Sequence, residues 1–220
     1  MQQKSRTIES NQTGPHERLE ATVLKHLKAD FKKPIADHTQ RVFDEVNKLV
    51  SKHAGSVVFD SCCGVGDSTR LIARDHPDHL VIGIDKSASR VTRERLQVDP
   101  ENMILRRADL NDFYRLMVTA GWQVEKHFVL YPNPWPKSAH LGRRWHGAPV
   151  FPYMLKLGGQ FEMRSNWKLY LEEFQIALKL AGHISELEAF EPEEYLTPFE
   201  KKYYESGQQV YRLITDIKPS

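Results

Sequence analysis

Three aspartates in the first half of the chain have the type and spacing expected of a site for a nucleoside-like ligand. Asp60, Asp85 and Asp109 each follow a short apolar run that is typical of a β-strand. Ligands of open α/β sheets bind where the carboxyl ends of the strands meet. Asp85 is placed to accept the two hydroxyls of a ribose, and Asp109 to contact an adenine edge. A single aspartate after a strand is usually a helix cap, but three in succession indicate a binding site.

A glycine loop follows the first of these aspartates. Gly64 and Gly66 leave room for a ligand directly above the backbone. A dinucleotide fingerprint requires a third glycine where this chain has Thr69, and Asp60 would repel a pyrophosphate. The same carboxylate suits a cation, such as the amino group of S-adenosylmethionine (SAM). The loop therefore indicates a methyltransferase cofactor site, and the alternative is a strand–helix turn without a ligand.

A second group of chemistry-bearing residues follows the fourth predicted strand. The segment Pro132-Asn-Pro-Trp-Pro-Lys137 has three prolines in five residues, which rigidify the backbone around Asn133. We expect a target base against this loop, with Arg143 and Arg144 on phosphates. The alternative is a proline-rich surface loop with a packed tryptophan.

Alternating strands and helices must position these residues. Strands are predicted at 56–60, 79–85, 102–107, 126–131, 159–164, 184–190 and 208–215. Helices are predicted from apolar spacing at 19–31, 42–50, 67–75, 87–97, 110–119, 150–156 and 167–181. This order predicts an α/β fold of the Rossmann-like class I SAM-dependent methyltransferase type. Its seven-stranded sheet is mostly parallel, with helices on both faces and an antiparallel last strand at the edge.

Length and composition favour a single globular domain. Of the 220 residues, 40% are hydrophobic, and the net charge of +2 does not by itself identify a nucleic-acid partner. Residues 1–16 are predicted to form a flexible tail and 17–220 a single domain. The polar N-terminus is not a secretory signal, and no apolar run reaches the ~20 residues that span a bilayer. Adjacent Cys62 and Cys63 suit neither a metal site nor an ordinary disulfide, so we expect a cytoplasmic protein without a metal. We also expect a monomer that binds no membrane.

The proline-rich segment resembles the bacterial TrmB family, the tRNA (guanine-N7)-methyltransferases, which have P-D-P-W-x-K followed by a basic run at this position. Leu157-Gly-Gly-Gln-Phe is similar to the family's L-x-x-G-G-x-F, and Ser165-Asn-Trp-Lys-Leu-Tyr170 to its T-D-W-x-x-Y. Thr197-Pro-Phe-Glu200 matches its T-x-F-E. Four such pieces occur in order, and the resemblance covers about residues 57–212.

The resemblance implies transfer of a methyl group from SAM to N7 of a guanosine in tRNA. It implies that the three aspartates bind the methyl donor and that the guanosine is contacted by Lys137, Thr197 and Glu200. The full predicted cofactor-binding set is Asp60, Gly64, Gly66, Asp85, Asp109 and Asn133, of which Asn133 is also the predicted catalytic residue. The full predicted tRNA-binding set is Lys137, Arg143, Arg144, Asn166, Thr197 and Glu200.

The chain departs from the family's pattern at several of these positions. Asn133 and Asn166 stand where the family has aspartates, and Ala139 and Gly142 where it usually has basic residues. Guanine N7 carries a lone pair and no proton, so the transfer needs alignment rather than a general base. Asparagine keeps the hydrogen-bond geometry but loses the charge that would stabilise the cationic product. Two alternatives therefore stay open, a catalytically weak paralogue that binds SAM or RNA, and a methyltransferase that acts on an exocyclic amine.

Overall fold

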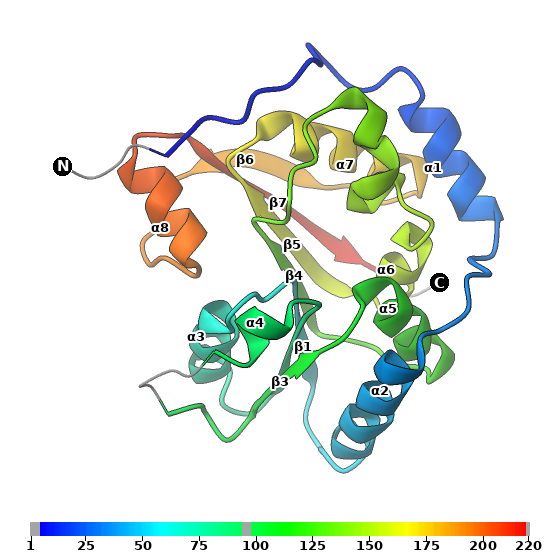
Figure 1. The fold of residues 1–220 in the computed structure, drawn as a ribbon, viewed down its shortest axis with the longest axis vertical. Helices are drawn as coiled ribbons and strands as arrows, with labels where there is room; N and C mark the ends of the chain where they lie inside the picture. The colour runs from blue at the N-terminus through cyan, green and yellow to red at the C-terminus, as the bar shows by residue number, and fades with distance from the viewer. Residues whose placement is uncertain (1–4, 94–97, 219–220) are drawn as a thin grey trace. The chain divides into compact units, whose positions relative to one another are not determined.

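The computed structural model describes residues 5–93 and 98–218, and its strands alternate with helices as predicted (Figure 1). The strands are β1 (Val57–Ser61), β2 (Leu80–Asp85), β3 (Met103–Arg107), β4 (Lys126–Leu130), β5 (Gly159–Ser165), β6 (Glu186–Phe190) and β7 (Val210–Ile217). The α-helices are α1 (Leu19–Lys28), α2 (Asp37–Val50), α3 (Asp67–Asp75), α4 (Ala88–Val91), α5 (Leu110–Thr119), α6 (Phe151–Lys156), α7 (Lys168–Leu180) and α8 (Pro198–Glu205). Two short 3-10 helices are η1 (Ser138–Arg143) and η2 (Trp145–Gly147).

The strands form one seven-stranded sheet in the order β3-β2-β1-β4-β5-β7-β6. Strands β1 to β4 pair in parallel, with Val57 opposite Leu80 and Val58 opposite Lys126. Strands β6 and β7 pair antiparallel, which confirms the predicted antiparallel last strand. Its predicted place at the edge is wrong, because β7 lies between β5 and β6. The more apolar β7 takes the inner position, and β6, with three of five side chains exposed, forms the edge.

Two predicted elements differ from those observed. The helix expected at 87–97 is observed as α4, which ends at Val91 with Thr92 as its C-cap, and residues 94–97 lie outside the described part. No helix is predicted between the last two strands, but the structure has α8 there. Thr197 caps this helix and Pro198 occupies its first turn, which is a common helix start.

The chain divides into two compact units. Unit 1 comprises Met1–Phe31, Tyr131–Pro152 and Glu162–Asp216. Unit 2 comprises Lys32–Leu130, Tyr153–Phe161 and Ile217–Ser220. The single domain expected for residues 17–220 stays a prediction.

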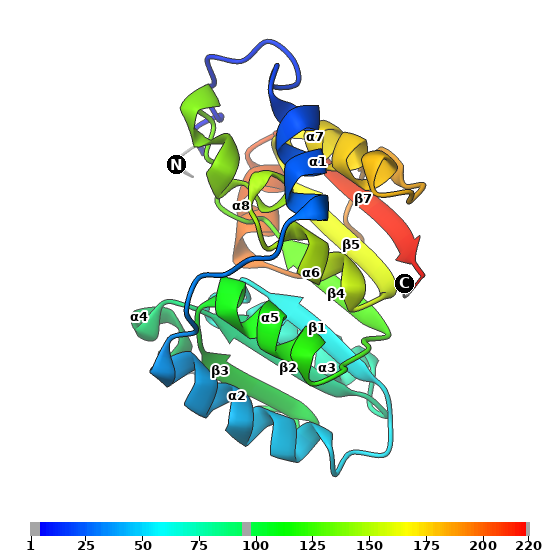
Figure 2. The ribbon, with the colours of Figure 1, turned by 90° about the vertical axis from the view of Figure 1, so that its right-hand side faces the viewer.

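Unit 2 is built around the central strand β1, whose five residues are all buried. Helix α3 covers one face of strands β1 to β3, and α2 and α5 cover the other (Figures 1 and 2). The Phe59 ring stacks on Phe113 at 6.0 Å between centroids, and Phe113 meets Phe43 edge-on at 5.3 Å. Burial of each such ring contributes roughly 1.5–3 kcal/mol, so this cluster fixes α2 and α5 on the sheet.

Unit 1 contains α1 and α7 side by side (Figure 2). The buried face of α7 carries Tyr170, Phe174 and Ala177, and Phe174 packs edge-on against Phe151 at 5.5 Å between centroids. One buried residue of this face, Glu173, is an acid with no exposed surface. An acid in that position requires partners, which are described below.

The N-terminal segment of unit 1, which its composition predicts to be a flexible tail, forms hydrogen bonds with other parts of this unit. Residues 5–16 form no helix or strand, but several of their polar groups are paired. Ser10 Oγ donates to the Pro136 carbonyl at 2.6 Å, and the His16 amide donates to Glu173 Oε1 at 2.8 Å. Polar composition does not distinguish a mobile segment from one with paired polar groups, and the flexibility of residues 1–16 stays a prediction.

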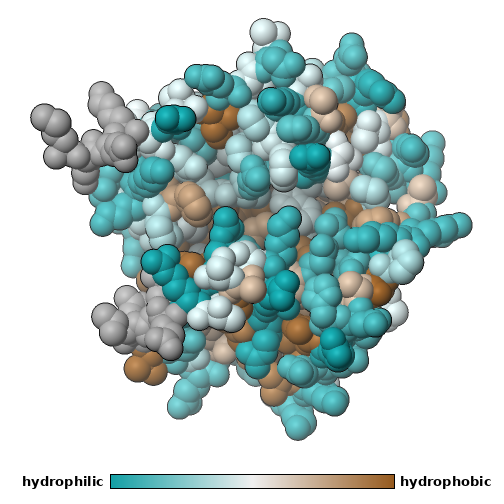
Figure 3. All heavy atoms as spheres, viewed as in Figure 1, coloured by the Kyte–Doolittle hydropathy of each residue, from teal (hydrophilic) through white to brown (hydrophobic). Residues whose placement is uncertain are grey.

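Hydrophilic side chains cover most of the face shown in Figure 3, where apolar side chains form small separate patches. The large apolar side chains that are exposed lie on different elements, among them Leu49 on α2 and Phe199 on α8. Among the described helices, none has the length and apolar character to cross a membrane. The described residues also contain no group of three or more His, Cys, Asp or Glu side chains placed to hold a metal ion.

Candidate active site

The glycine loop of unit 2 connects β1 to α3 through left-handed backbone. Cys62, Gly64 and Gly66 have φ values of 61°, 62° and 80°, and Gly66 is the residue that precedes the helix. A Cβ atom at Gly66 would lie 2.9 Å from Leu105 Cδ2, whereas at Gly64 it would meet nothing within 4 Å. At position 66, both the positive φ and the close approach of Leu105 require glycine. At position 64, the positive φ favours glycine, and the space above the backbone is open.

Asp60 lies beneath this loop with no exposed surface. The hydroxyls of Ser68 and Thr69 both donate to Asp60 Oδ2 at 2.7 Å. Its other oxygen, Oδ1, is buried and has no partner among the described residues. Burial raises the pKa of Asp60 to about 6, although the two hydroxyl donors act in the opposite direction. A buried carboxylate with one free oxygen is suited to a cationic or N–H donor from a ligand.

Asp85 closes the other side of the loop. Its Oδ2 accepts the Gly64 amide at 3.2 Å, and its Oδ1 accepts the Ser87 amide at 2.8 Å. The Arg90 guanidinium lies 3.7 Å from Oδ2. Asp85 is also close enough to Asp60 to contribute to the raised pKa of that group. The structure therefore brings the predicted residues Asp60, Gly64, Gly66 and Asp85 together.

The third predicted aspartate, Asp109, is a helix cap. Its Oδ1 accepts the amide and the side-chain nitrogen of Asn111 at 2.9 and 3.1 Å at the start of α5. Its own amide donates to Thr39 Oγ1 at 3.2 Å. Asp109 thus caps a helix, which is the usual role of an aspartate after a strand. Its contact with an adenine edge stays a prediction.

Close packing between α3 and β2 fixes the hydroxyl donors of Asp60. Gly83 in β2 lies directly beneath Thr69, and a Cβ atom at Gly83 would be 2.4 Å from Thr69 Oγ1 and 3.1 Å from Cys63 Sγ. Only glycine allows Thr69 to approach β2 this closely. The sequence identifies Thr69 only as the residue in place of a third glycine, because its contact with Asp60 depends on this tertiary packing.

The proline-rich loop of unit 1 runs from Tyr131 to Lys137 after β4. Tyr131 and Trp135 both have φ of 48°, which is uncommon for residues other than glycine. Asn133 lies between them, is exposed, and makes no hydrogen bond within the described residues. Lys137 is also exposed, and the Arg143 guanidinium lies 4.7 Å from the centroid of the Trp135 ring. Three of the predicted residues, Asn133, Lys137 and Arg143, therefore present accessible side chains.

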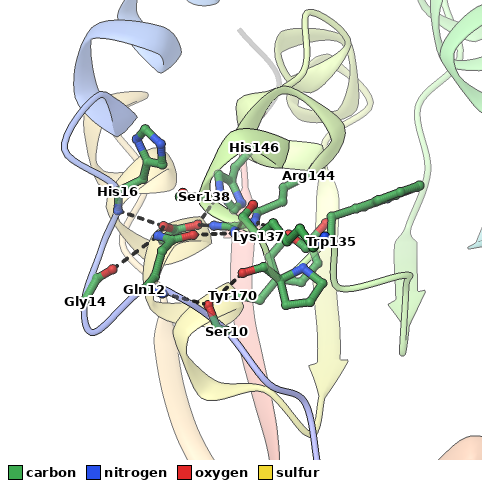
Figure 4. A network of polar contacts seen from close by, with 12 residues as sticks. Ser10, Gln12, Gly14, His16, Trp135, Lys137, Ser138, Arg144, His146 and Tyr170 are labelled. Carbon is green, nitrogen blue, oxygen red and sulfur yellow. Dashed lines mark hydrogen bonds and ion pairs between the residues drawn. The ribbon is translucent and has the colours of Figure 1, made fainter.

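The prediction that Arg144 contacts an RNA phosphate is wrong for this structure. The side chain has no exposed surface and is paired with the buried carboxylate of Glu173 (Figure 4). His146 Nε2 lies 3.0 Å from the same carboxylate oxygen. Burial acts to raise the pKa of Glu173, but the hydrogen bonds and charges of His146 and Arg144 outweigh it and lower the pKa to about 2. The double-arginine sequence does not reveal which of the two side chains turns inward.

Thr197 and Glu200 form a capping pair at the start of α8. Thr197 Oγ1 accepts the Glu200 amide at 3.0 Å, and Glu200 Oε2 accepts the Leu196 amide at 2.8 Å. Glu200 is fully buried, and its Oε1 accepts Tyr131 OH and Arg164 Nη1, both at 3.0 Å. Sequence reasoning did not single out Tyr131 or Arg164.

Asn166, at the end of β5, is tied to a different part of unit 1. Its side-chain nitrogen donates to Gln208 Oε1 at 2.8 Å. The amide nitrogen of Gln208 in turn donates to the Ser5 carbonyl at 3.0 Å. A role for Asn166 toward a substrate stays a prediction.

The sequence matches the family Methyltransf_4, whose description is "Putative methyltransferase", over residues 54–213. The chain belongs to this methyltransferase family. The match confirms the resemblance seen in the sequence, and it includes both the glycine loop and the proline-rich loop.

Curated relatives of this methyltransferase share a common name. The chain is 29% identical over 172 residues to a protein of Aquifex aeolicus (strain VF5) named tRNA (guanine-N(7)-)-methyltransferase, with 69% of this chain and 53% of that protein covered. A protein of the same name from Mycoplasma pneumoniae (strain ATCC 29342 / M129 / Subtype 1) is 22% identical over 188 residues, with 78% and 89% covered. The chain thus spans about half the length of the first relative and most of the second.

Solved structures support the fold of the methyltransferase. One described as "Structure of an Antibiotic Related Methyltransferase" has a TM-score of 0.58 and 13% sequence identity, with 88% of this chain and 98% of that chain covered. At this identity the likeness shows the fold alone, and it confirms the predicted methyltransferase architecture.

Proposed function

We propose that this methyltransferase transfers the methyl group of SAM to N7 of a guanosine in tRNA. The substrate assignment rests on the relatives from Aquifex and Mycoplasma, both named tRNA (guanine-N(7)-)-methyltransferase. The observation on this chain that carries the cofactor assignment is the buried, unpartnered Oδ1 of Asp60 on a glycine loop that Asp85 closes.

The residues of unit 2 fit the chemistry of SAM. Asp60 Oδ1 accepts the ammonium group of its amino-acid part, and the backbone at Gly64 passes beneath the ligand. Asp85 accepts the ribose hydroxyls, and Asp109 contacts the adenine edge with the oxygen that the α5 cap does not use. When bound, SAM supplies an electrophilic methyl group on a sulfonium.

The residues of unit 1 orient the guanosine. N7 has an in-plane lone pair, so the protein needs to hold the base and exclude competing orientations rather than remove a proton. Asn133 contacts the reacting groups through its amide, and Lys137, Asn166 and Thr197 bind the nucleoside. Arg143 contacts a phosphate, whereas the buried Arg144 has no contact with the tRNA. Glu200 contacts the loop through the Tyr131 hydroxyl, but Arg164 pairs with its carboxylate, so it does not replace the charge of an aspartate at position 133.

One assay tests this function. The protein is incubated with radiolabelled SAM and bulk tRNA from cells that lack 7-methylguanosine, and the digested nucleosides are separated. We expect label in 7-methylguanosine. Label in a methyladenosine would instead indicate an exocyclic amine target, and tight SAM binding without a labelled nucleoside would indicate a binding paralogue.

tRNA is the macromolecular substrate, and the protein acts as a cytoplasmic monomer. Light scattering coupled to size-exclusion chromatography checks the oligomeric state, and a dimer would contradict it.

A further inference from the structure

The proline-rich loop does not have the donors needed to fix its own conformation. Its three prolines have no N–H group, so this stretch offers few backbone donors. Tyr131 and Trp135 are nevertheless held at φ of 48°. A non-glycine residue in this region is strained and persists only where its surroundings enforce it. The loop therefore depends on donors from other segments that act on its carbonyl groups.

Those donors are side chains, and they reach three consecutive carbonyls (Figure 4). Arg144 Nε and Nη2 donate to the Trp135 carbonyl at 3.2 and 3.1 Å, and Nη2 also lies 3.4 Å from the Lys137 carbonyl. Ser10 Oγ donates to the carbonyl between them, that of Pro136, at 2.6 Å. A side chain thus fixes each residue of 135–137.

The N-terminal segment also fixes the arginine itself. Gln12 Oε1 accepts Arg144 Nη2 at 2.5 Å, and Gln12 Nε2 donates to Glu173 Oε1 at 3.0 Å. A single amide therefore bridges both members of the buried ion pair. One residue earlier, Asn11 and Ser138 exchange two hydrogen bonds of 3.0 and 2.9 Å.

We propose that Ser10 and Gln12 are positioning residues for methyl transfer. They hold residues 135–137, and through them the exposed side chains of Asn133 and Lys137, in the geometry that the guanosine meets. This inference rests on the proposed function, because it concerns the same loop. An error of about 1 Å in a reacting geometry can cost about a hundredfold in rate. Polar contacts far from the reacting atoms therefore have a measurable effect on turnover.

The test compares the double variant Ser10→Ala/Gln12→Ala with Thr13→Ala, an exposed position in the same segment. We expect kcat on tRNA to fall by about tenfold in the double variant and to stay near the wild-type value in Thr13→Ala. SAM affinity should fall by less than kcat does, because only Asn133 of the predicted cofactor residues lies on this loop, whereas Asp60 and Asp85 lie in unit 2. The variant Ser10→Thr/Gln12→Ala, which keeps a hydroxyl at position 10, should have a higher kcat than Ser10→Ala/Gln12→Ala. A double variant with the kcat of Thr13→Ala would overturn the proposal.

Hydrogen–deuterium exchange separates this outcome from a failure of the proposed function. The amides of Ser138 and His140 should exchange at least about tenfold faster in the double variant than in Thr13→Ala, whether or not tRNA is methylated. Absence of 7-methylguanosine with the wild-type protein would refute the proposed function, and the exchange rates would still decide whether the segment holds the loop. Unchanged exchange would overturn the inference.

Discussion

The two loops that carry the candidate site are fixed by opposite means. The glycine loop of unit 2 is held by its own backbone donors, since the Gly64 amide donates to Asp85 and the Cys63 amide to the Ile84 carbonyl. The proline-rich loop of unit 1 is held through its carbonyls by side chains from other segments. Beneath the glycine loop, Oδ1 of the buried Asp60 is free for a ligand. Beside the proline-rich loop, both oxygens of the buried Glu173 accept hydrogen bonds from the protein itself. Burial of an acid alone therefore does not distinguish a ligand site from a scaffold.

Removing the scaffold carboxylate should have the largest effect. Glu173→Ala leaves the fully buried Arg144 without its charged partner, which costs about 3–5 kcal/mol of unfolding free energy. Urea denaturation measures this loss. The matched control is Glu172→Ala on the same helix, where a surface pair with Lys168 predicts a change below about 0.5 kcal/mol. Equal losses in the two variants would show that Glu173 is not structural.

Removing the ligand-side carboxylate should affect binding more than folding. Asp85→Ala removes the proposed acceptor for two ribose hydroxyls, and hydrogen bonds to a charged group contribute roughly 1.5–3 kcal/mol each. We expect SAM affinity to fall by at least about tenfold in calorimetry. Asp85→Asn, which keeps an oxygen for the loop amides, should lose less. Unchanged affinity in Asp85→Ala would contradict the cofactor assignment.

The free oxygen of Asp60 predicts a pH dependence of SAM binding. With a pKa of about 6 in the ligand-free protein, this carboxylate loses its charge as the pH falls below that value. About a tenth of it is ionised at pH 5, so SAM affinity should weaken by up to about tenfold between pH 7.5 and pH 5. 5′-Methylthioadenosine, which has no amino-acid part, should show a flat profile. A flat profile for SAM itself would place its ammonium elsewhere.

A carboxylate restored to the substrate loop should raise turnover. Asn133→Asp is nearly isosteric at an exposed position, so folding should be little affected. The added charge stabilises the positive charge that develops on the base, and we expect a several-fold rise in kcat on tRNA. A clear fall in guanosine methylation would show that the asparagine itself is the working group.

The smallest expected effect concerns Arg143, the accessible member of the arginine pair. Arg143→Ala should weaken tRNA binding modestly and reduce the slope of log K against log salt by about 0.7–0.9, the value for one phosphate contact. Arg18→Ala, at an exposed site before α1, is the control. Weaker binding with an unchanged slope would exclude the phosphate role and favour its packing on Trp135.

The sequence is most informative where local pattern and function coincide. The succession of strands and helices along the chain, the glycine loop, and Asp60 and Asp85 at strand ends follow from apolar periodicity and from the conformations that glycine allows. The partners of Glu173 do not, because they come from positions 12, 16, 144 and 146, which only the tertiary fold brings together. One signal was present: Glu173 occupies the apolar face of its helix, beside Tyr170 and Phe174. The capping signature Thr197-x-x-Glu200 was also legible, but family resemblance gave it a substrate role.

The close approach of Thr69 to Gly83 has an evolutionary consequence. Any side chain at position 83 would displace the hydroxyl that donates to Asp60. Positions 69 and 83 are thus expected to change together among related sequences, with a larger residue at 83 tolerated only where 69 has become small. A lineage that lost the threonine would accept a side chain at position 83 once Cys63, whose Sγ would lie 3.1 Å from the new Cβ atom, had also shifted, whereas one that kept the threonine would require the glycine.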